Sequence, residues 1–202
     1  MATSEKASPR DRLLDAAARL SYRDGVSVGI EALCRAAGVS KRSMYQLFDS
    51  KDAMLAASLE RGAPWYEARF THPDPESASP RERILYVFER LEQASLDAGY
   101  HGCPYLAVLV ELKDPEHPAG KVAREVKERL AAAFRAEAGR GGARDPELLA
   151  RQLLLVFDGA SARAGAGVEQ LADGLATATA TALLDAAGMR RTDPAQGRSG
   201  QG

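Results

Sequence analysis

The chain has 202 residues, with 27 Lys and Arg against 28 Asp and Glu. It is long enough for a small domain and a larger one, and its net charge near zero argues against a protein that coats nucleic acid without regard to sequence. No apolar run approaches the ~20 residues of a membrane span and no hydrophobic secretory core opens the sequence, which indicates a cytoplasmic protein.

Two cysteines, Cys34 and Cys103, are too few for a disulfide framework or a zinc set. We therefore expect neither a metal site nor a bound cofactor, and we expect Cys34 to be a buried packing residue. Residues 1–51 carry 9 Lys and Arg against 6 Asp and Glu, so the positive charge lies at the front of the chain.

The first elements are a short disordered segment and a helix. We expect residues 1–9 to be disordered. Leu13, Ala17 and Leu20 fall on one stripe of residues 10–24, which predicts an amphipathic helix. Gly25 ends it.

Two short helices follow, separated by a tight turn. Four apolar residues repeat at i, i+3, i+4 and i+7: Ile30, Leu33, Cys34 and Ala37. They predict a helix with one buried face. Gly38 suits a turn that needs positive φ, and Ser40 suits the N-cap of a second helix that starts with Lys41 and Arg42. This is the pattern of a helix-turn-helix, whose second helix reads the major groove.

Together with the helix before it, this segment resembles the DNA-binding domain of the TetR/AcrR family of bacterial transcriptional regulators. The resemblance is carried by the run LCRAAGVSKRSMYQLFDSKDAM over residues 33–54. It extends over residues 10–60 and elsewhere rests on the helical layout alone. Gly29, Cys34 and Ser43 depart from the usual Thr, Ala and Thr of the family, and Gly29 costs a phosphate contact more than it costs the fold.

Seven residues are candidates for contact with DNA: Ser40, Lys41, Arg42, Ser43, Tyr45, Gln46 and Lys51. Lys41 and Arg42 are expected at base edges, and Arg42 above all because a guanidinium pairs bidentately with guanine. Gln46, one turn later, is a weaker candidate for the same role. The resemblance implies phosphate contacts for Tyr45, Lys51 and Ser43, whereas Ser40 mainly caps the helix.

The remainder of the chain predicts further helices. Ser50 caps a helix that runs to about residue 70 and carries six large residues inward: Met54, Leu55, Leu59, Trp65, Tyr66 and Phe70. Residues 72–80 are rich in proline and predict a loop. Helices are then expected over residues 81–98, 103–112, 121–137, 145–166 and 168–187. The segment 103–112 could equally be a buried strand by composition, but a lone strand would have nothing to pair with.

The last two predicted helices are rich in small residues. Their expected inward stripes are Leu149, Leu153, Val156, Phe157, Leu171, Leu175, Ala178, Ala182 and Leu183. Two such helix pairs related by a two-fold axis would form a four-helix bundle, so we expect a homodimer. A dimer also places two reading helices about one DNA turn apart, at ~34 Å, on a palindrome. Residues 190–202 are expected to be a disordered tail.

These elements predict an all-α fold with two domains. Residues 10–51 are expected to form the DNA-binding domain and residues 52–189 a helical domain for effector binding and dimerisation. The resemblance implies a pocket for a small effector, and candidate lining residues are Trp65, Tyr66, Phe88, Cys103, Tyr105, Leu109 and Phe157. Few charges on these stripes favour an apolar or aromatic effector. Repression, with release from DNA by the effector, is the family's usual mode.

Two other readings compete with a DNA-binding regulator. An enzyme could use His101 and Cys103 with a carboxylate such as Glu111, but no glycine-rich elbow or orienting partner accompanies them, so we expect no catalytic residues. A helical adaptor that binds only protein would leave the cationic turn at Lys41 and Arg42 without a purpose.

Overall fold

The structure is a computed structural model that describes residues 7–189. The expectations for residues 1–6 and for the tail at 190–202 lie outside this range. Over residues 7–189 the chain forms nine α-helices and no strand, which confirms the all-α prediction. The helices are α1 (Pro9–Asp24), α2 (Ile30–Ala37), α3 (Lys41–Leu47), α4 (Lys51–Ala68), α5 (Pro80–Ser95), α6 (Pro104–Glu111), α7 (Pro118–Arg140), α8 (Pro146–Gly165) and α9 (Leu175–Ala186).

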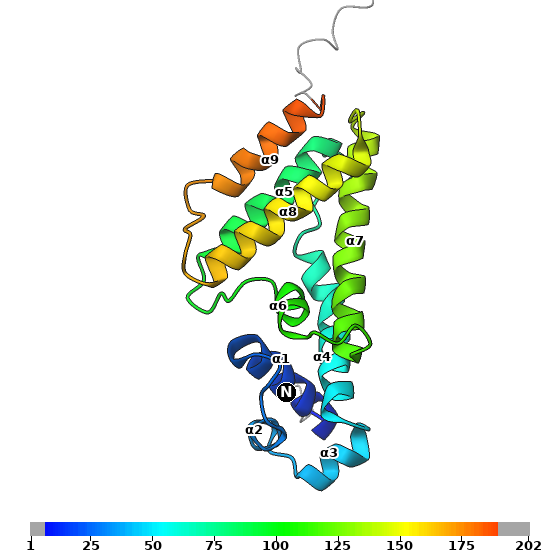
Figure 1. Ribbon diagram of the computed structural model, residues 1–202, viewed down its shortest axis with the longest axis vertical. Helices are drawn as coiled ribbons and strands as arrows, with labels where there is room; N and C mark the ends of the chain where they lie inside the picture. The colour runs from blue at the N-terminus through cyan, green and yellow to red at the C-terminus, as the bar shows by residue number, and fades with distance from the viewer. Residues whose placement is uncertain (1–6, 190–202) are drawn as a thin grey trace, which may run out of the picture.

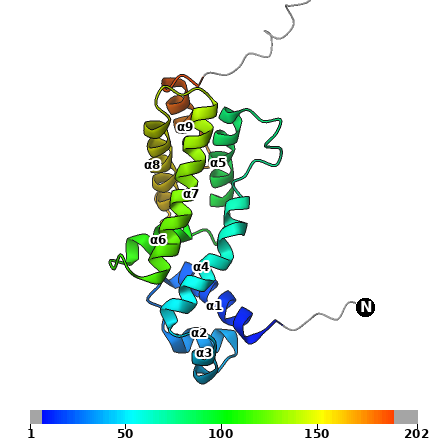
Figure 2. The same ribbon diagram turned by 90° about the vertical axis from the view of Figure 1, so that its right-hand side faces the viewer.

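The molecule is elongated, and its two ends differ (Figure 1). Helices α1 to α3 form a small head at one end, whereas α5, α8 and α9 lie together at the other. Helix α4 leaves the head and packs along the long helix α7, so these two helices join the ends, as the second view shows (Figure 2). Short α6 lies between the head and the far bundle.

Hydroxyl side chains cap α1, the first helix of the head, and α4, the helix that leaves it. Ser8 accepts a hydrogen bond from the Asp11 amide at 3.1 Å, and Ser50 accepts one from the Ala53 amide at 3.0 Å. Each satisfies an amide that the first turn of a helix leaves without a partner. Because Ser8 caps α1 and Pro9 is its first residue, the folded part begins before residue 10, where the sequence analysis had set it.

The apolar interior consists of two clusters. One, the near cluster, joins α1, α2, α3 and α4 to α6 and the start of α7, and it contains Cys34 and Met44. The other, the far cluster, joins α5, the end of α7, α8 and α9. Cys34 is 6% exposed, as expected of a packing residue, and its burial raises the pKa of the thiol.

The last helix starts later than predicted. Residues 168–174 form a loop because Gly167 and Gly174 adopt φ values of 68° and 78°, a left-handed conformation that ends one helix and precedes the next. The expected inward stripe of Leu175, Ala178 and Ala182 was wrong within one chain. These side chains are exposed, and α9 instead buries Ala176, Ala180 and Leu184.

Two further differences concern helix lengths and Trp65. Helix α5 stops at Ser95 rather than near residue 98, and α7 is longer than predicted because Pro118 can occupy its first turn. Trp65 was expected to point inward, but it is 71% exposed. No helix within residues 7–189 has both the length and the apolar character needed to cross a membrane.

Candidate DNA-binding surface and effector cavity

The turn between α2 and α3 depends on one glycine. Gly38 has φ 62° and ψ 38°, and the Val39 amide donates to the Cys34 carbonyl at 3.0 Å. Added side-chain atoms would meet nothing within 4 Å of Gly38, so its backbone conformation, rather than lack of space, requires glycine. Val39 then packs against the apolar interior of the head, which fixes the direction in which α3 leaves.

Helix α3 is anchored on one face and exposed on the other. Ser40 caps it by accepting from the Ser43 amide at 3.0 Å, as predicted, and Met44 is fully buried. Four of the candidate DNA-binding side chains are exposed on its outer side: Lys41, Arg42, Tyr45 and Gln46. Lys41 lies 3.4 Å from Glu31, but both side chains are more than half exposed, so water screens this pair.

Lys51 is the first residue of α4, and its ammonium, unlike the exposed side chains of α3, is hydrogen-bonded within the protein. Its ammonium donates to the carbonyls of Val26 and Val28, at 3.0 and 3.4 Å. These carbonyls belong to the segment between α1 and α2, so Lys51 ties α4 to that segment. An ammonium has three donors, and one remains for a phosphate.

Two arginines of α1 also serve the head, and the sequence analysis had not singled them out. Arg12 donates to the Ala37 carbonyl at 3.0 Å and so satisfies the end of α2. The Arg10 guanidinium lies over the Phe48 ring, 5.2 Å from its centre, just past the end of α3. The signal for neither contact is local, because each partner is more than 20 residues away.

A cavity of about 450 Å³ lies between α1, α4, α5 and the α6 region. Four of the predicted pocket residues line it: Trp65, Tyr66, Cys103 and Tyr105. Phe88 and Phe157 do not line it, because both are fully buried in the far cluster, where Phe88 stacks on Phe134 with ring centres 5.8 Å apart. Leu109 does not line it either and packs against the near cluster.

The tyrosines of this cavity bond to protein groups. The Tyr66 hydroxyl donates to the Cys103 sulfur at 3.0 Å, and the Tyr105 hydroxyl donates to the Leu59 carbonyl at 3.1 Å. Burial raises the pKa of Tyr66 and raises that of Tyr100 to about 12. The phenols therefore stay neutral over the physiological pH range and contribute no charge to the cavity.

The head itself supplies one wall. The Tyr22 hydroxyl donates to the Gly102 carbonyl at 3.0 Å and accepts from the His101 amide at 2.8 Å. Nearby, the Glu111 carboxylate accepts from the Val26 amide at 2.8 Å. Both Tyr22 and Glu111 line the cavity, so a bound molecule would touch the groups that join the head to the α6 region.

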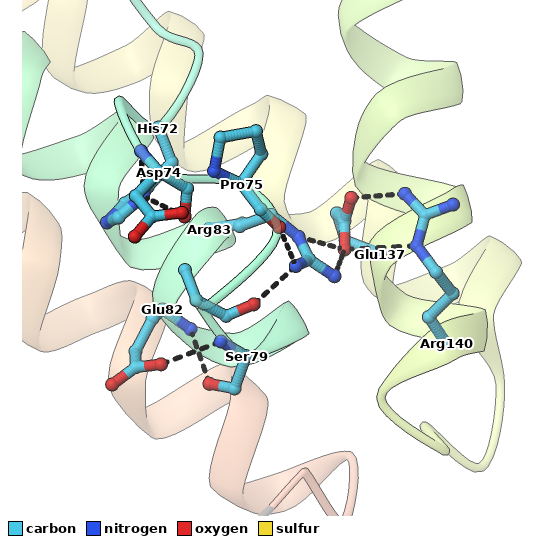
Figure 3. A network of polar contacts seen from close by, with 9 residues as sticks. His72, Asp74, Pro75, Ser79, Glu82, Arg83, Glu137 and Arg140 are labelled. Atoms are coloured by element: carbon cyan, nitrogen blue, oxygen red, sulfur yellow. Dashed lines mark hydrogen bonds and ion pairs between the residues drawn. The ribbon is translucent and has the colours of Figure 1, made fainter.

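A second cavity of about 300 Å³ lies between α4, α5 and α7. Tyr66 and Phe70 line both cavities, and their rings meet edge to face. Arg83 and Glu137 form an ion pair in the wall of the second cavity, and Arg140 also bonds to Glu137 (Figure 3). Arg129 and Glu67 form another ion pair in the same wall, so each arginine that lines this cavity has a carboxylate partner.

The residues considered for an enzyme, His101, Cys103 and Glu111, line a common pocket, but no hydrogen bond among the described residues joins them. The Cys103 sulfur accepts from Tyr66 and from the Leu106 amide, and the His101 ring packs against Tyr22 with ring centres 5.4 Å apart. The Glu111 carboxylate bonds to Val26. Among residues 7–189 no group of His, Cys, Asp and Glu is arranged to hold a metal ion.

Comparisons with known proteins agree with this architecture. The family model described as bacterial regulatory proteins, tetR family, matches residues 13–58. Two uncharacterized helix-turn-helix-type transcriptional regulators from Mycobacterium tuberculosis strains are each 36% identical over 76 residues, 37% of this chain and 38% of theirs. The match therefore spans little more than a third of the length of these curated relatives.

Solved structures match over nearly the whole chain. A protein from Streptomyces avermitilis, assigned to the TetR transcriptional regulators, is 61% identical, with a TM-score of 0.88 over 91% of this chain and 100% of that chain. A TetR-family regulator from Streptomyces coelicolor, 24% identical, has the same fold, with a TM-score of 0.81 over 89% of this chain and 95% of that chain. Given the extent of the first match and the agreement of the family model over the helix-turn-helix, the chain belongs to the TetR family of transcriptional regulators.

Proposed function

We propose that this protein is a repressor that binds a palindromic operator as a homodimer and is released by a small effector. The observation that carries the proposal is the exposed outer side of α3, where Lys41, Arg42, Tyr45 and Gln46 lie together at one end of the molecule. Such a surface fits a major groove, with base edges read by side chains and the backbone held by phosphate contacts.

The residues of α3 divide between these tasks. We propose that Arg42 pairs with a guanine and that Lys41 and Gln46 read neighbouring bases. Tyr45, 52% exposed, would hold a phosphate through its hydroxyl. Ser43 is half-buried and bonds to Ser40 at 2.8 Å, so its phosphate contact would come second to capping, and Lys51 would add the one donor that Val26 and Val28 leave free.

Helices α8 and α9 support the homodimer. Three leucines on their outer sides are between 44% and 74% exposed: Leu148, Leu155 and Leu175. Small side chains such as Ala162, Ala178 and Ala182 lie on the same exposed sides. A large exposed apolar surface on a soluble domain marks an interface, and small residues let helices approach closely.

Helices α4 to α9 form the body of the molecule. The effector would act through the cavity that lies between the head and this body. Trp65, Tyr66, Cys103 and Tyr105 would contact it, and the α1 wall would transmit its presence. A ligand shifts the population only if it binds one arrangement of the heads better than the other. A molecule that pushes on Tyr22 or Glu111 would disturb the bonds that hold the head against the α6 region, which supports release from DNA.

The proposal implies a protein that acts in the cytoplasm and without catalysis. The experiment that tests it is selection of bound sequences from a random duplex pool with the full chain. An enriched palindrome with half-sites about one helical turn apart is expected. Recovery of no preferred sequence, or of a single unrepeated site, would contradict the dimeric reading.

A further inference from the structure

We propose that the cavity between α1, α4, α5 and the α6 region takes a small organic anion with an apolar body, and that Arg69 binds its charged group. This inference rests on the proposed function, because it names the class of effector for the same cavity. The effector would then be apolar or aromatic in its body, as expected from the sequence, and would also carry a negative charge. Arg69, the residue that follows α4, is one of the lining residues.

Most hydroxyl groups around the cavity already have partners within the protein. The hydroxyls of Tyr22, Tyr66 and Tyr105 each bond to a protein group. The Tyr100 hydroxyl is 3.0 Å from the Ser161 hydroxyl, and the Ser58 hydroxyl donates to the Leu14 carbonyl at 2.9 Å. The cavity therefore offers a ligand few free neutral donors.

The charged residues that line the cavity favour an anionic ligand. Four charged residues line the cavity: Asp15, Arg19, Arg69 and Glu111. Asp15 forms an ion pair with Arg61, and Glu111 accepts from the Val26 amide. Within the part of the chain from residue 7 to 189, neither Arg19 nor Arg69 has a hydrogen-bonded or ionic partner for its guanidinium. Arg61 offsets the charge of Asp15, whereas the amide bond of Glu111 leaves its negative charge in place. The lining therefore carries two available guanidinium groups against one uncompensated carboxylate, and the balance favours an anion.

Arg69 is the better placed of the two arginines. Its guanidinium lies over the Trp65 ring, 5.7 Å from the ring centre, which restrains it at the rim of the cavity. Arg69 is half-buried, whereas Arg19 is exposed, and water screens an exposed charge more strongly. A restrained, partly dehydrated guanidinium binds a planar carboxylate well. The positive charge of Arg69 also opposes the rise that burial causes in the pKa of Tyr22 and Tyr100, consistent with a guanidinium close to both phenols.

The body of the ligand would lie deeper. The inner part of the cavity is formed by buried or half-buried side chains, among them Leu91, Tyr66, Cys103 and Tyr105. The second cavity offers a contrast, since Arg83 and Arg129 in its wall are paired with Glu137 and Glu67. Of these two cavities, only the first combines an apolar interior with unpaired cations.

The test compares two probes that share a body and differ in charge, 4-phenylbutyrate and 4-phenylbutan-1-ol. The carboxyl group is ionised at pH 7. The chain has one tryptophan, so quenching or a spectral shift of Trp65 fluorescence reports occupancy of this cavity directly, with calorimetry as a second readout. The acid is expected to bind about tenfold more tightly than the alcohol, as a charge-assisted hydrogen bond allows.

Variants then assign the charge. Arg69→Gln should remove the preference for the acid and leave binding of the alcohol unchanged, whereas Arg19→Gln should reduce the preference only slightly. Arg129→Gln, in the wall of the second cavity, is the matched control and should change neither affinity. Equal affinities of the two probes for the unaltered protein, no binding of either, or equal loss of both in Arg69→Gln would overturn the inference. DNA binding without probe is measured on the same samples, so a failure of the effector class leaves the DNA-binding proposal standing on its own data.

Discussion

The head and the body of this molecule expose different kinds of surface. The head presents polar and cationic side chains on α3, held outward by one buried residue, Met44. The body presents leucines on α8 and α9 and holds two cavities. Positive charge on an exposed surface suits binding to a polyanion, whereas an exposed apolar surface suits contact with another copy of the same chain. We therefore expect the two ends to have separate functions, so that a substitution can impair the function of one end and leave the other end intact.

The largest effect is expected from breaking the body while leaving the head intact. Leu155 is 74% exposed on α8, so Leu155→Glu should cost the folded monomer little but place a charge in the proposed dimer interface. Loss of the second reading head should weaken binding to a palindrome by about 100-fold or more, because the second contact then lacks its high effective concentration. Sedimentation velocity and a DNA titration measure the two effects.

The control for this variant is Leu96→Glu, since Leu96 is 59% exposed just after α5. It should remain dimeric and bind the palindrome normally. A Leu155→Glu protein that stays dimeric at micromolar concentration would assign the interface to another surface, and the contrast between head and body would then need another explanation.

The next effect concerns base reading by the head. Arg42→Ala should cost about 1 to 3 kcal/mol of binding free energy on the preferred site and relax discrimination at one base position. Arg35→Ala is the matched control, because Arg35 is an exposed arginine on the neighbouring helix α2. Both variants should remain dimeric. If Arg42→Ala weakens all duplexes equally, Arg42 contacts phosphate rather than a base.

Lys51 sharpens the comparison because it serves both structure and binding. Lys51→Met keeps the apolar stem but removes the donors to Val26 and Val28. We expect the free energy of unfolding to fall by about 1 kcal/mol, and binding to weaken on every sequence with a salt slope smaller by about one unit. Thermal unfolding and titrations at several salt concentrations test this.

A matched control exists in the body. Lys113 also donates to a backbone carbonyl, that of Val110 at 2.6 Å, but it lies between α6 and α7 rather than next to α3 in the sequence. Lys113→Met should leave the salt slope unchanged. An unchanged slope in Lys51→Met as well would restrict Lys51 to its structural bonds.

How much the sequence predicts also differs between head and body. In the head, the proposed DNA-binding residues are neighbours in the sequence, and one local pattern, a turn at Gly38 followed by a cap at Ser40, fixes both the helices and the exposed surface. The contacts of Arg12 and Lys51 escaped prediction, because their acceptors are backbone carbonyls that only the folded chain brings near.

In the body, periodicity predicts that helices form but not which neighbour each face meets. Phe88 and Phe157 have the same apolar character as the lining residues, yet they pack in the far cluster. Trp65 follows the inward period of α4 but lies on the rim of a cavity whose other wall is α1. The availability of Arg69 could not be predicted, since it depends on which distant carboxylates already have partners.

The smallest effect is expected from the ion pairs that Glu137 of α7 forms with Arg83 and Arg140. Burial disfavours the charged form of Glu137, but hydrogen bonds from Arg140 and Arg83 outweigh it and lower the pKa of the carboxyl below its ordinary 4.5. A lowered pKa in the folded state contributes stability above about pH 4.5, and this stability is lost as the pH falls through the folded value. Urea unfolding of Glu137→Gln should show lower stability than the unaltered protein at pH 7.

The difference between these two proteins should narrow below about pH 4.5, because the Gln variant has no proton to take up at this position. Glu147→Gln is the control, since Glu147 forms an exposed pair with Arg135 at 3.1 Å, and surface pairs contribute little. Its unfolding curve should follow that of the unaltered protein at every pH. Parallel pH dependence of Glu137→Gln and the unaltered protein would mean that Arg83 and Arg140 stabilise Glu137 no more than a surface pair does.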